Sequence, residues 1–287
     1  LVMIIGGFVC MGVNKGTSGT ALNYSLDFVG GTSTNVTFNE DMDLAALDSQ
    51  VVPVIEKITK DANVQVQKVA GGNQVIFKTR TLDVEERQAL TEALVENFGV
   101  NSDLITAETI SSTISSEMRS DAIVAVVIAA ICMLLYIWFR FKDIRFATSS
   151  VAALIHDVLV VLAFYAVARV SVGSTFIACM LTIVGYSINA TIVIFDRIRE
   201  NLGAMTKKDD LEQLVNRSIS QTLSRSIFTS LTTFFMVAAL FVLGVSSIRE
   251  FALPLMVGIV CGTYSSVCIT GALWYVLRTK IGTKKNK

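Results

Sequence analysis

A histidine–aspartate pair inside an apolar segment is the feature of this sequence that most clearly suggests chemistry. His156 and Asp157 are the only acidic or basic side chains in residues 146–168. A carboxylate inside a membrane is costly and commonly serves ion movement or pairs with a cation. Adjacent helix positions point about 100° apart, so we do not expect these two side chains to pair with each other. Asp157 is a candidate proton or ion site, or the partner of an arginine; the alternative is an interhelical hydrogen bond that fixes packing.

No metal, cofactor or catalytic site is expected from the sequence. His156 is the single histidine, and it is expected to be a packing donor, because no second histidine or cysteine is placed beside it. The five cysteines lie in apolar runs without metal-ligand spacing and are expected to be small packing residues; they are Cys10, Cys132, Cys179, Cys261 and Cys268. Because the sequence has no Ser-His or His-x-x-x-His arrangement, the chain is not expected to be an enzyme.

A second polar group lies further along the chain. Asn189 and Thr191 fall within the apolar residues 170–195 and can form hydrogen bonds to neighbouring helices. Arg225 precedes the apolar residues 226–248, and its side chain either reaches to the membrane interface or points inward at a carboxylate. Together with His156 and Asp157, these residues are the candidates for ion coupling.

The elements that must position these side chains are membrane helices. Hydrophobic residues make up 52% of the 287-residue chain and charged residues only 17%, against about 25% charged in soluble domains. Five apolar runs approach or exceed the roughly 20 residues that span a bilayer; they are 122–139, 146–168, 170–195, 226–248 and 251–277. Residues 1–14 are shorter, and we expect them to be the outer end of a first helix whose beginning is missing. The sequence therefore predicts an α-helical polytopic membrane protein with six transmembrane helices.

The distribution of charge predicts the orientation. Lys and Arg gather in residues 140–145, in 196–225 and after residue 277, and short loops rich in these residues stay cytoplasmic. Both termini are expected inside. The predicted domains are 1–14, a first transmembrane helix; 15–119, an acidic extracytoplasmic domain; and 120–287, five transmembrane helices with a cytoplasmic loop 196–225 and a basic C-terminal tail. Residues 202–225 are expected to form an interfacial helix. No basic stripe interleaved with aromatics suggests nucleic acid.

The extracytoplasmic domain has a readable pattern of strands and helices. Strands are predicted at 32–38, 63–70, 74–80 and 103–110, and helices at 43–60 and 83–98. Pro53 is an unfavourable residue within the first of these helices. Gly71-Gly72-Asn73 is the expected hairpin turn. The order βαββαβ predicts an α+β ferredoxin-like domain. It contains no histidine, cysteine or phosphate-binding glycine loop, so a binding or lever module is expected.

Three motifs carry a resemblance to a known family. The first is Leu-Asp-Phe-Val-Gly-Gly-Thr at 26–32, with Asp27, Phe28, Gly30 and Gly31. The second runs from Gly185 through Asn189 and Thr191 to Phe-Asp-Arg-Ile-Arg-Glu-Asn at 195–201, with Asp196, Arg197, Arg199, Glu200 and Asn201. The third is Arg-Ser-Ile-x-Thr-Ser at 225–230. In these motifs, and in His156-Asp157, the chain resembles the SecF family, or the SecF half of a fused SecDF, within the resistance-nodulation-division superfamily.

The resemblance implies a function and partners. It implies an auxiliary subunit of the bacterial Sec translocase that assists preprotein export across the plasma membrane with the transmembrane ion gradient, protons being the expected ion. SecD is the implied partner, with the SecYEG channel, YidC as a further candidate, the unfolded preprotein and the lipid bilayer. Two other functions stay open: an exporter of small molecules or lipids from the same superfamily, which would have twelve spans and larger outer domains, and a scaffold subunit without coupling.

One residue departs from the family pattern. The pattern reads Asn-Asp-Thr where this sequence has Asn189-Ala190-Thr191, and the resemblance implies that the family aspartate carries protons. An alanine methyl group cannot titrate. The coupling site has then moved to Asp157 or to a carboxylate of SecD, or this chain couples differently, or Ala190 replaces a natural aspartate.

Overall fold

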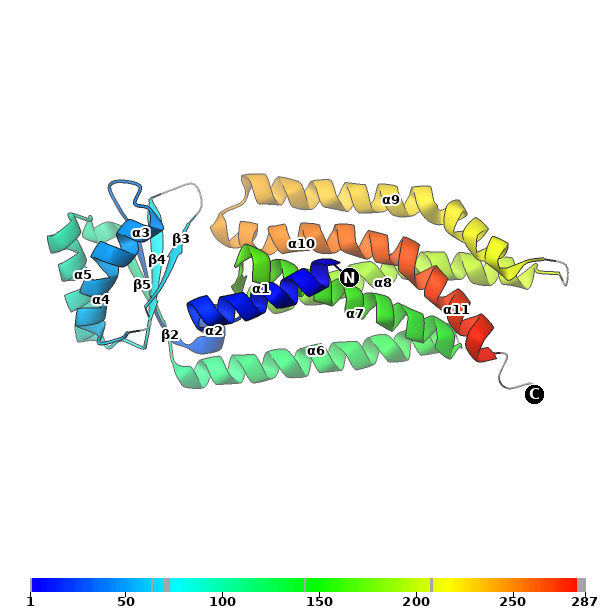
Figure 1. The fold of residues 1–287 in the computed structure, drawn as a ribbon, viewed down its shortest axis with the longest axis horizontal. Coiled ribbons are helices and arrows are strands. Elements are labelled where there is room, and N and C mark those ends of the chain that lie inside the picture. The colour runs from blue at the N-terminus through cyan, green and yellow to red at the C-terminus, as the bar shows by residue number, and fades with distance from the viewer. Residues whose placement is uncertain (1, 63, 70–72, 142, 207–208, 283–287) are drawn as a thin grey trace. The chain divides into compact units, whose positions relative to one another are not determined.

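The computed structural model describes residues 2–62, 64–69, 73–141, 143–206 and 209–282 (Figure 1). The chain divides into two units, one formed by Leu1–Asn23 with Ile123–Lys287 and the other by Tyr24–Ala122. We call them the membrane unit and the outer unit. The short strand β1 (Asn23–Tyr24) lies where the chain passes from the first to the second.

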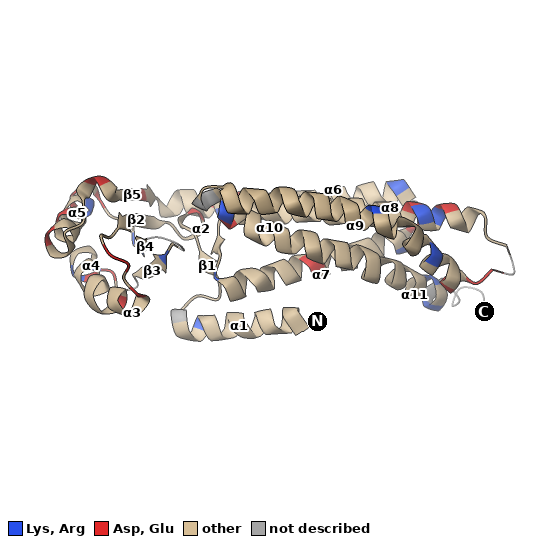
Figure 2. Cartoon of the chain, turned by 90° about the horizontal axis from the view of Figure 1, so that it is seen from above, with Lys and Arg blue, Asp and Glu red and all other residues tan. Residues whose placement is uncertain are grey.

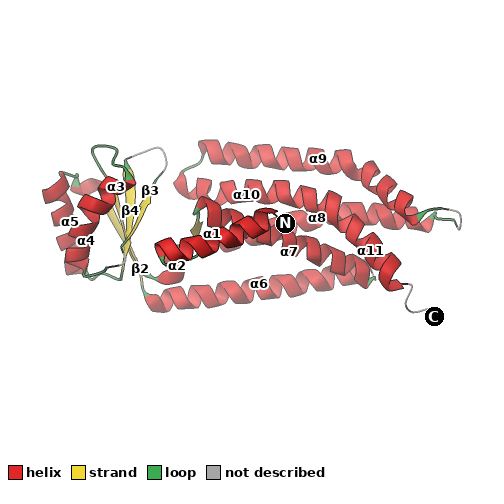
Figure 3. Cartoon of the chain, in the orientation of Figure 1, coloured by secondary structure: helices red, strands yellow, loops and turns green. Residues whose placement is uncertain are grey.

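Long apolar helices make up the membrane unit (Figure 3). Its elements are α1 (Val2–Ser18), α6 (Ser112–Phe141), which begins in the outer unit, α7 (Ile144–Ala168), β6 (Ser171–Val172), α8 (Ser174–Gly203), α9 (Leu211–Leu243), α10 (Ser246–Ser265), the π-helical η3 (Ser266–Thr270) and α11 (Gly271–Gly282). Five helical stretches in the described residues are long and apolar enough to cross a membrane, the last of them joining α10 to α11, and α1 is a shorter apolar helix. The chain is therefore a multi-pass membrane protein. Of the six predicted spans, five meet this length criterion within the described residues, and the predicted first span corresponds to the shorter α1.

Most of residues 196–225, predicted to connect two spans with a helix at 202–225, is helical, but as extensions of the two membrane helices. Helix α8 continues to Gly203, and α9 already begins at Leu211, where Asp210 accepts a hydrogen bond from the backbone N–H of Glu212. No separate interfacial helix occurs in the described part of 202–225. Instead, each of the two membrane helices continues without interruption from the apolar region into the polar region. Charged residues gather near these helix ends and are sparse along the middles of the helices (Figure 2). Lys207, Lys208 and the basic tail 283–287 lie outside the described residues.

Glycines let the membrane helices approach closely. A Cβ atom on Gly258 of α10 would lie 2.4 Å from the Ile183 side chain of α8, and one on Gly262 would lie 3.2 Å from Cβ of Ser187. A Cβ on Gly7 of α1 would lie 2.2 Å from Cβ of Ala163 on α7. Small residues at such interfaces allow backbones to pack together. Helix α10 is thereby held against α8, and it also packs on α7 and α9.

The outer unit has the predicted order strand, helix, strand, strand, helix, strand. Its elements are α2 (Leu26–Val29), β2 (Gly31–Thr37), α3 (Leu44–Ala46), η1 (Leu47–Val51), α4 (Val52–Thr59), β3 (Gln65–Lys68), β4 (Gln74–Thr79), α5 (Val84–Phe98), η2 (Ser102–Leu104) and β5 (Ile105–Ile110). The antiparallel sheet has the order β3-β4-β2-β5. Pro53 sits in the first turn of α4, where its missing N–H is tolerated. The predicted turn residues Gly71 and Gly72 lie outside the described residues.

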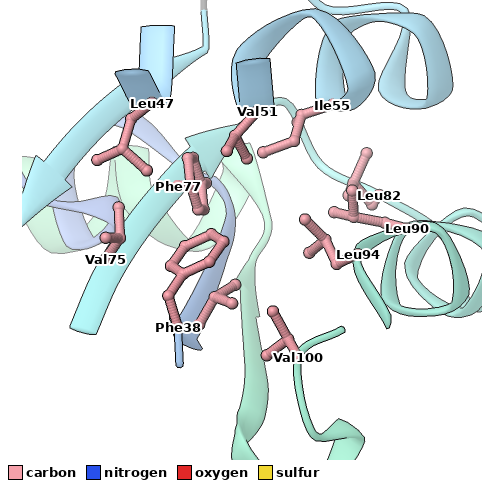
Figure 4. Close-up of a cluster of buried hydrophobic side chains, with 11 residues drawn as sticks. Phe38, Leu47, Val51, Ile55, Val75, Phe77, Leu82, Leu90, Leu94 and Val100 are labelled. Atoms are coloured by element: carbon pink, nitrogen blue, oxygen red, sulfur yellow. The ribbon is translucent and has the colours of Figure 1, made fainter. Parts of the chain in front are cut away.

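One face of this sheet and its helices enclose the core of the outer unit (Figure 4). Phe77 of β4 is fully buried, and its ring meets Phe38 edge to face at 6.3 Å between centroids. Leu47 and Val51 come from η1, and Leu94 comes from α5; all three are fully buried. The alternation of buried and half-buried positions along β2 and β4 supplies the apolar face that these helices cover.

Polar contacts fix the start of α5. The Asp83 side chain accepts a hydrogen bond from the backbone N–H of Glu86, and the Glu86 carboxylate accepts one from the backbone N–H of Asp83. This capping box satisfies two backbone donors. The Glu86 carboxylate also pairs with the Arg80 guanidinium. The hydrogen bond from Arg80 lowers the pKa of Glu86, and the same contact raises the pKa of Arg80.

Candidate functional site

A buried carboxylate lies where three membrane helices meet. Asp157 of α7 is 1% exposed, and its Oδ2 atom accepts hydrogen bonds from Ser187 Oγ of α8 and Ser265 Oγ of α10, each at 2.6 Å. Its Oδ1 atom accepts a hydrogen bond from the Cys261 thiol of α10 at 3.3 Å. Hydrogen bonds from three side chains stabilise a carboxylate that the membrane would otherwise destabilise. Both oxygens are therefore held in one orientation.

His156 contacts the same carboxylate, contrary to the expectation that neighbours on a helix do not pair. Its Nδ1 atom lies 3.1 Å from Asp157 Oδ1 and 3.9 Å from Cys261 Sγ. The 100° separation of the two Cα–Cβ directions is bridged because the imidazole turns back toward the carboxylate. The expectation that no cysteine stands beside His156 is also wrong, since α10 carries Cys261 there.

Thr191 belongs to the same polar network through a second serine. Its hydroxyl lies 3.0 Å from Ser266 Oγ, and Ser266 donates to the Ser187 carbonyl at 3.2 Å. Thr191 is buried. Ser265 and Ser266 stand where α10 widens into the π-helical η3, a local irregularity that is frequent at functional sites. The network therefore runs from Asp157 through Ser187 to Thr191.

Asn189 and Arg225 are not brought to this network. Both side chains are exposed, on α8 and α9 respectively, and Ala190 is half-buried. Within the described residues, the Arg225 guanidinium takes part in no ion pair. The face of α9 that points inward carries Ser218, Thr222, Ser226 and Ser230 instead, at intervals of four residues. The predicted coupling residues thus divide into a buried group and an exposed group.

The motif at 196–201 ties helix ends together. Asp196 of α8 pairs with Arg140 of α6 at 2.8 Å. Arg197 donates to the side-chain oxygen of Gln221 on α9 at 2.7 Å and pairs with Glu200. Asn201 donates to Ser218 Oγ and Gln221 Oε1, and Arg199 donates to the Arg140 carbonyl. These residues hold α6, α8 and α9 in register.

The glycine motif near residue 30 makes a sharp change of direction. Helix α2 buries Phe28, ends at Gly30 and leads directly into β2, and both Gly30 and Gly31 have positive φ, 77° and 119°. A Cβ atom on Gly31 would lie 2.3 Å from the carbonyl oxygen of Thr79. Asp27 is half-buried in α2. The motif is explained by backbone geometry inside the outer unit.

Gly31→Ala is expected to destabilise the outer unit by at least about 1–3 kcal/mol, because the methyl group meets backbone as well as requiring an unfavourable φ. Gly99→Ala is the matched control, since Gly99 has φ 62° but no neighbour closer than 3.9 Å. Its cost should be that of the left-handed conformation alone, about 1–2 kcal/mol. Denaturant unfolding of both variants measures the difference. Equal stability would show that the Thr79 contact has no effect.

Gly258→Leu is expected to move α10 away from α8, because the new side chain occupies the space of Ile183. Overpacking of this kind costs about 1–3 kcal/mol, and here it also separates Cys261 and Ser265 from Asp157. Thermal unfolding in detergent measures the loss. Val260→Leu on the same helix is the control, since Val260 is exposed. Equal melting temperatures of the two variants would contradict the packing argument.

Sequence reasoning did not assign three of the residues that contact Asp157: Ser187, Cys261 and Ser265. Each is a small polar residue inside an apolar run. Ser187 stood in a motif already noted, four residues before Thr191, a spacing that places both on one face of a helix. Cys261 and Ser265 have the same spacing on α10. Small polar residues four apart on two helices were the available signal.

Comparisons with known proteins place this fold in a family. The family model described as protein export membrane protein SecD/SecF, C-terminal, matches residues 90–280. The protein translocase subunit SecF of Sebaldella termitidis is 39% identical over 256 residues, which cover 89% of this chain and 82% of that protein. SecF of Vibrio alginolyticus is 36% identical over 272 residues, covering 92% and 82%.

Fused relatives and solved structures agree. The protein translocase subunit SecDF of Thermus thermophilus is 38% identical over 256 residues, which cover 88% of this chain and 34% of that protein. A crystal structure of SecDF from Thermus thermophilus, described as a translocon-associated membrane protein, matches with a TM-score of 0.78 at 34% identity, covering all of this chain and 37% of that one. The chain thus spans about a third of SecDF and more than four fifths of the SecF relatives. It belongs to the SecF family of protein translocase subunits.

Proposed function

We propose that the chain works with SecD as an auxiliary subunit of the Sec translocase, helping preproteins through the SecYEG channel across the bacterial plasma membrane. YidC is a further candidate partner. The observation that carries the proposal is the similarity to SecF over nearly the whole chain, at 34–39% identity for the SecF relatives compared. The substrate is an unfolded preprotein, and the energy comes from the transmembrane ion gradient, protons being the proposed ion.

An unsatisfied polar face supports SecD as the partner. Asn189 lies halfway along α8 and is exposed, as is Arg225 on α9. An arginine and an amide facing lipid are unfavourable, and such residues normally face a bundle interior. Transporters built from repeated halves place their coupling sites where the halves meet. We therefore assign this face to contact with the spans of SecD, with α1 as a sixth span of this half.

Asp157 is the proposed coupling residue of this chain. Ala190 cannot titrate, whereas Asp157 is a buried carboxylate, linked to Thr191 through the Ser187 side chain, the Ser187 backbone carbonyl and the Ser266 hydroxyl. A scaffold without coupling is the second candidate, favoured by the methyl group at position 190. The effect of Asp157→Asn distinguishes the two.

The outer unit is proposed to be a ferredoxin-like module that contacts the emerging polypeptide. The strand order β3-β4-β2-β5, with two helical segments on the sheet, supports this assignment. The edge strand β5 carries four exposed residues, 106–109, in its centre. An open strand edge can pair with an extended peptide. This unit is proposed to face outside, with both chain termini in the cytoplasm.

Photo-crosslinking tests the SecD contact. A photoreactive amino acid at position 189 is expected to crosslink SecD in membranes. The same group at position 139 is the control, since Phe139 is 81% exposed and lies on a different helix, α6. Purification of the complex should recover SecYEG as well. Equal SecD crosslinking from both positions, or none from position 189, would contradict the proposed interface.

A further inference from the structure

We propose that His156, Asp157 and Cys261 form a binding site for a divalent transition-metal ion, with Zn²⁺ the best match. Their ligand atoms, Nδ1, a carboxylate oxygen and Sγ, all lie within 4.8 Å of one another. The three atom types are those that bind zinc in proteins. They come from α7 and α10, and Cys261 is 104 residues from Asp157 along the chain, so the folding of the membrane unit assembles them. The site goes beyond the proposed export function.

The separations of the three ligand atoms fit one shared ion. Nδ1 of His156 lies 3.1 Å from Oδ1 of Asp157, Sγ of Cys261 lies 3.3 Å from the same oxygen, and Sγ lies 3.9 Å from Nδ1. A tetrahedral zinc with ordinary bond lengths separates such ligands by about 3.3–3.6 Å. Shifts of a few tenths of an ångström convert the observed triangle into a coordination triangle.

Two serines orient the carboxylate for this role. Ser187 and Ser265 both donate to Oδ2 of Asp157 at 2.6 Å, whereas the histidine and the cysteine both contact Oδ1. One oxygen is thus held by hydroxyl groups and the other faces the possible ligands. Metal sites generally have such supporting hydrogen bonds, which fix the ligand and tune its affinity. With Oδ2 held by the two serines, Oδ1 is the carboxylate oxygen that lies beside both His156 and Cys261.

Charge balance favours a divalent ion inside the membrane. A carboxylate and a thiolate together carry two negative charges, which cancel those of Zn²⁺, while the imidazole stays neutral. An isolated charge in an apolar medium is strongly unfavourable, so a neutral complex is the form that this environment accepts. On binding, the Cys261 thiol releases its proton to water and Sγ forms the bond to zinc. The imidazole keeps its one proton on Nε2, which leaves the Nδ1 lone pair for the metal.

The fourth position is proposed to hold a water molecule, and His156 is the most exposed of the three ligands. The His156 side chain is 21% exposed, whereas Asp157 is 1% exposed and Cys261 is 9% exposed. The exposed Tyr264 flanks the imidazole, with 6.3 Å between ring centroids. An ion bound here would join α7 to α10 and occupy the Asp157 carboxylate. Zinc is therefore expected to oppose any role of Asp157 in ion movement.

Cobalt titration of the purified full chain in detergent tests the site, because Co²⁺ takes zinc positions and gives a thiolate charge-transfer absorption. We expect one Co²⁺ per chain, with that absorption, and its displacement by Zn²⁺. Cys261→Ser should lose the absorption. Cys268→Ser is the matched control, since Cys268 lies in η3 of the same helical segment but is exposed, and it should keep the absorption. Ser265→Ala should weaken binding about 10–100-fold without removing any ligand.

The outcomes separate the proposal from its alternative. If the trio is only a hydrogen-bonded packing contact, the chain shows no stoichiometric cobalt absorption, and the proposal fails. Absorption that persists in Cys261→Ser and disappears in Cys268→Ser would place the metal elsewhere and also overturn it. Should Cys261→Ser not fold, His156→Gln, at the more exposed ligand, provides the same comparison. None of these readouts depends on SecD or on export, so they stand apart from the proposed function.

Discussion

Asp157→Asn is expected to remove the gradient-dependent part of preprotein export while the fold survives. Asparagine keeps the shape of the side chain and can still accept hydrogen bonds from Ser187 and Ser265, which hold Oδ2 at 2.6 Å. It cannot gain or lose a proton. Alanine at this position is a poorer test, because it leaves both serines without their acceptor, at about 1–3 kcal/mol for each buried unsatisfied group.

Export into inverted membrane vesicles, with and without an uncoupler, measures this effect. The variant should export at the rate that the unchanged protein shows in the presence of the uncoupler. Ala190→Ser is the control and should export normally, because neither the alanine nor the serine that replaces it can titrate. Ala190→Asp is expected to be tolerated, since Ala190 is only half-buried and lies next to the exposed amide of Asn189. Full gradient-dependent export by Asp157→Asn would move coupling to SecD and favour the scaffold role for this chain.

The elements of the outer unit could be predicted because their signals are local. Asp83 and Glu86 form a capping box within four residues, and alternation along 74–80 marks a strand whose buried face includes Phe77. The extents of the membrane helices were less predictable. Charge marks where a helix leaves the membrane, but not where it ends. Residues 202–225 were therefore expected to form a separate interfacial helix, whereas α8 and α9 extend into this segment from the membrane.

The environment of Asp157 could be predicted only in part. Its position inside a span was evident from the sequence, because a carboxylate in an apolar run stands out. The identity of its partners depends on how α7, α8 and α10 pack, and that packing follows from Gly258 and Gly262, which bring α10 against α8. Tertiary contacts over about a hundred residues leave no periodic signal. The exposure of Arg225 is likewise decided by which face of α9 packs inward.

Phe77→Ala is expected to unfold the outer unit while leaving the membrane helices folded. Phe77 is fully buried among the side chains of two helices and the sheet (Figure 4). Replacing such a phenylalanine by alanine costs about 3–5 kcal/mol, a large fraction of the roughly 5–15 kcal/mol that stabilises a typical domain. The hydrophobic cluster around it contains residues of the outer unit alone, so the loss should be confined to that unit.

Hydrogen exchange of the full chain in detergent measures where protection is lost. Amides of β2, β4 and α5 should exchange faster in Phe77→Ala, and those of α7 and α8 should not change. Val84→Ala is the control, because Val84 at the start of α5 is 68% exposed, and surface substitutions usually change stability by less than about 0.5 kcal/mol. If the outer unit acts on the emerging preprotein, export should fall with Phe77→Ala although the membrane unit stays inserted. Unchanged export, with protection of the outer unit lost, would mean that the folded outer unit is not needed for that step.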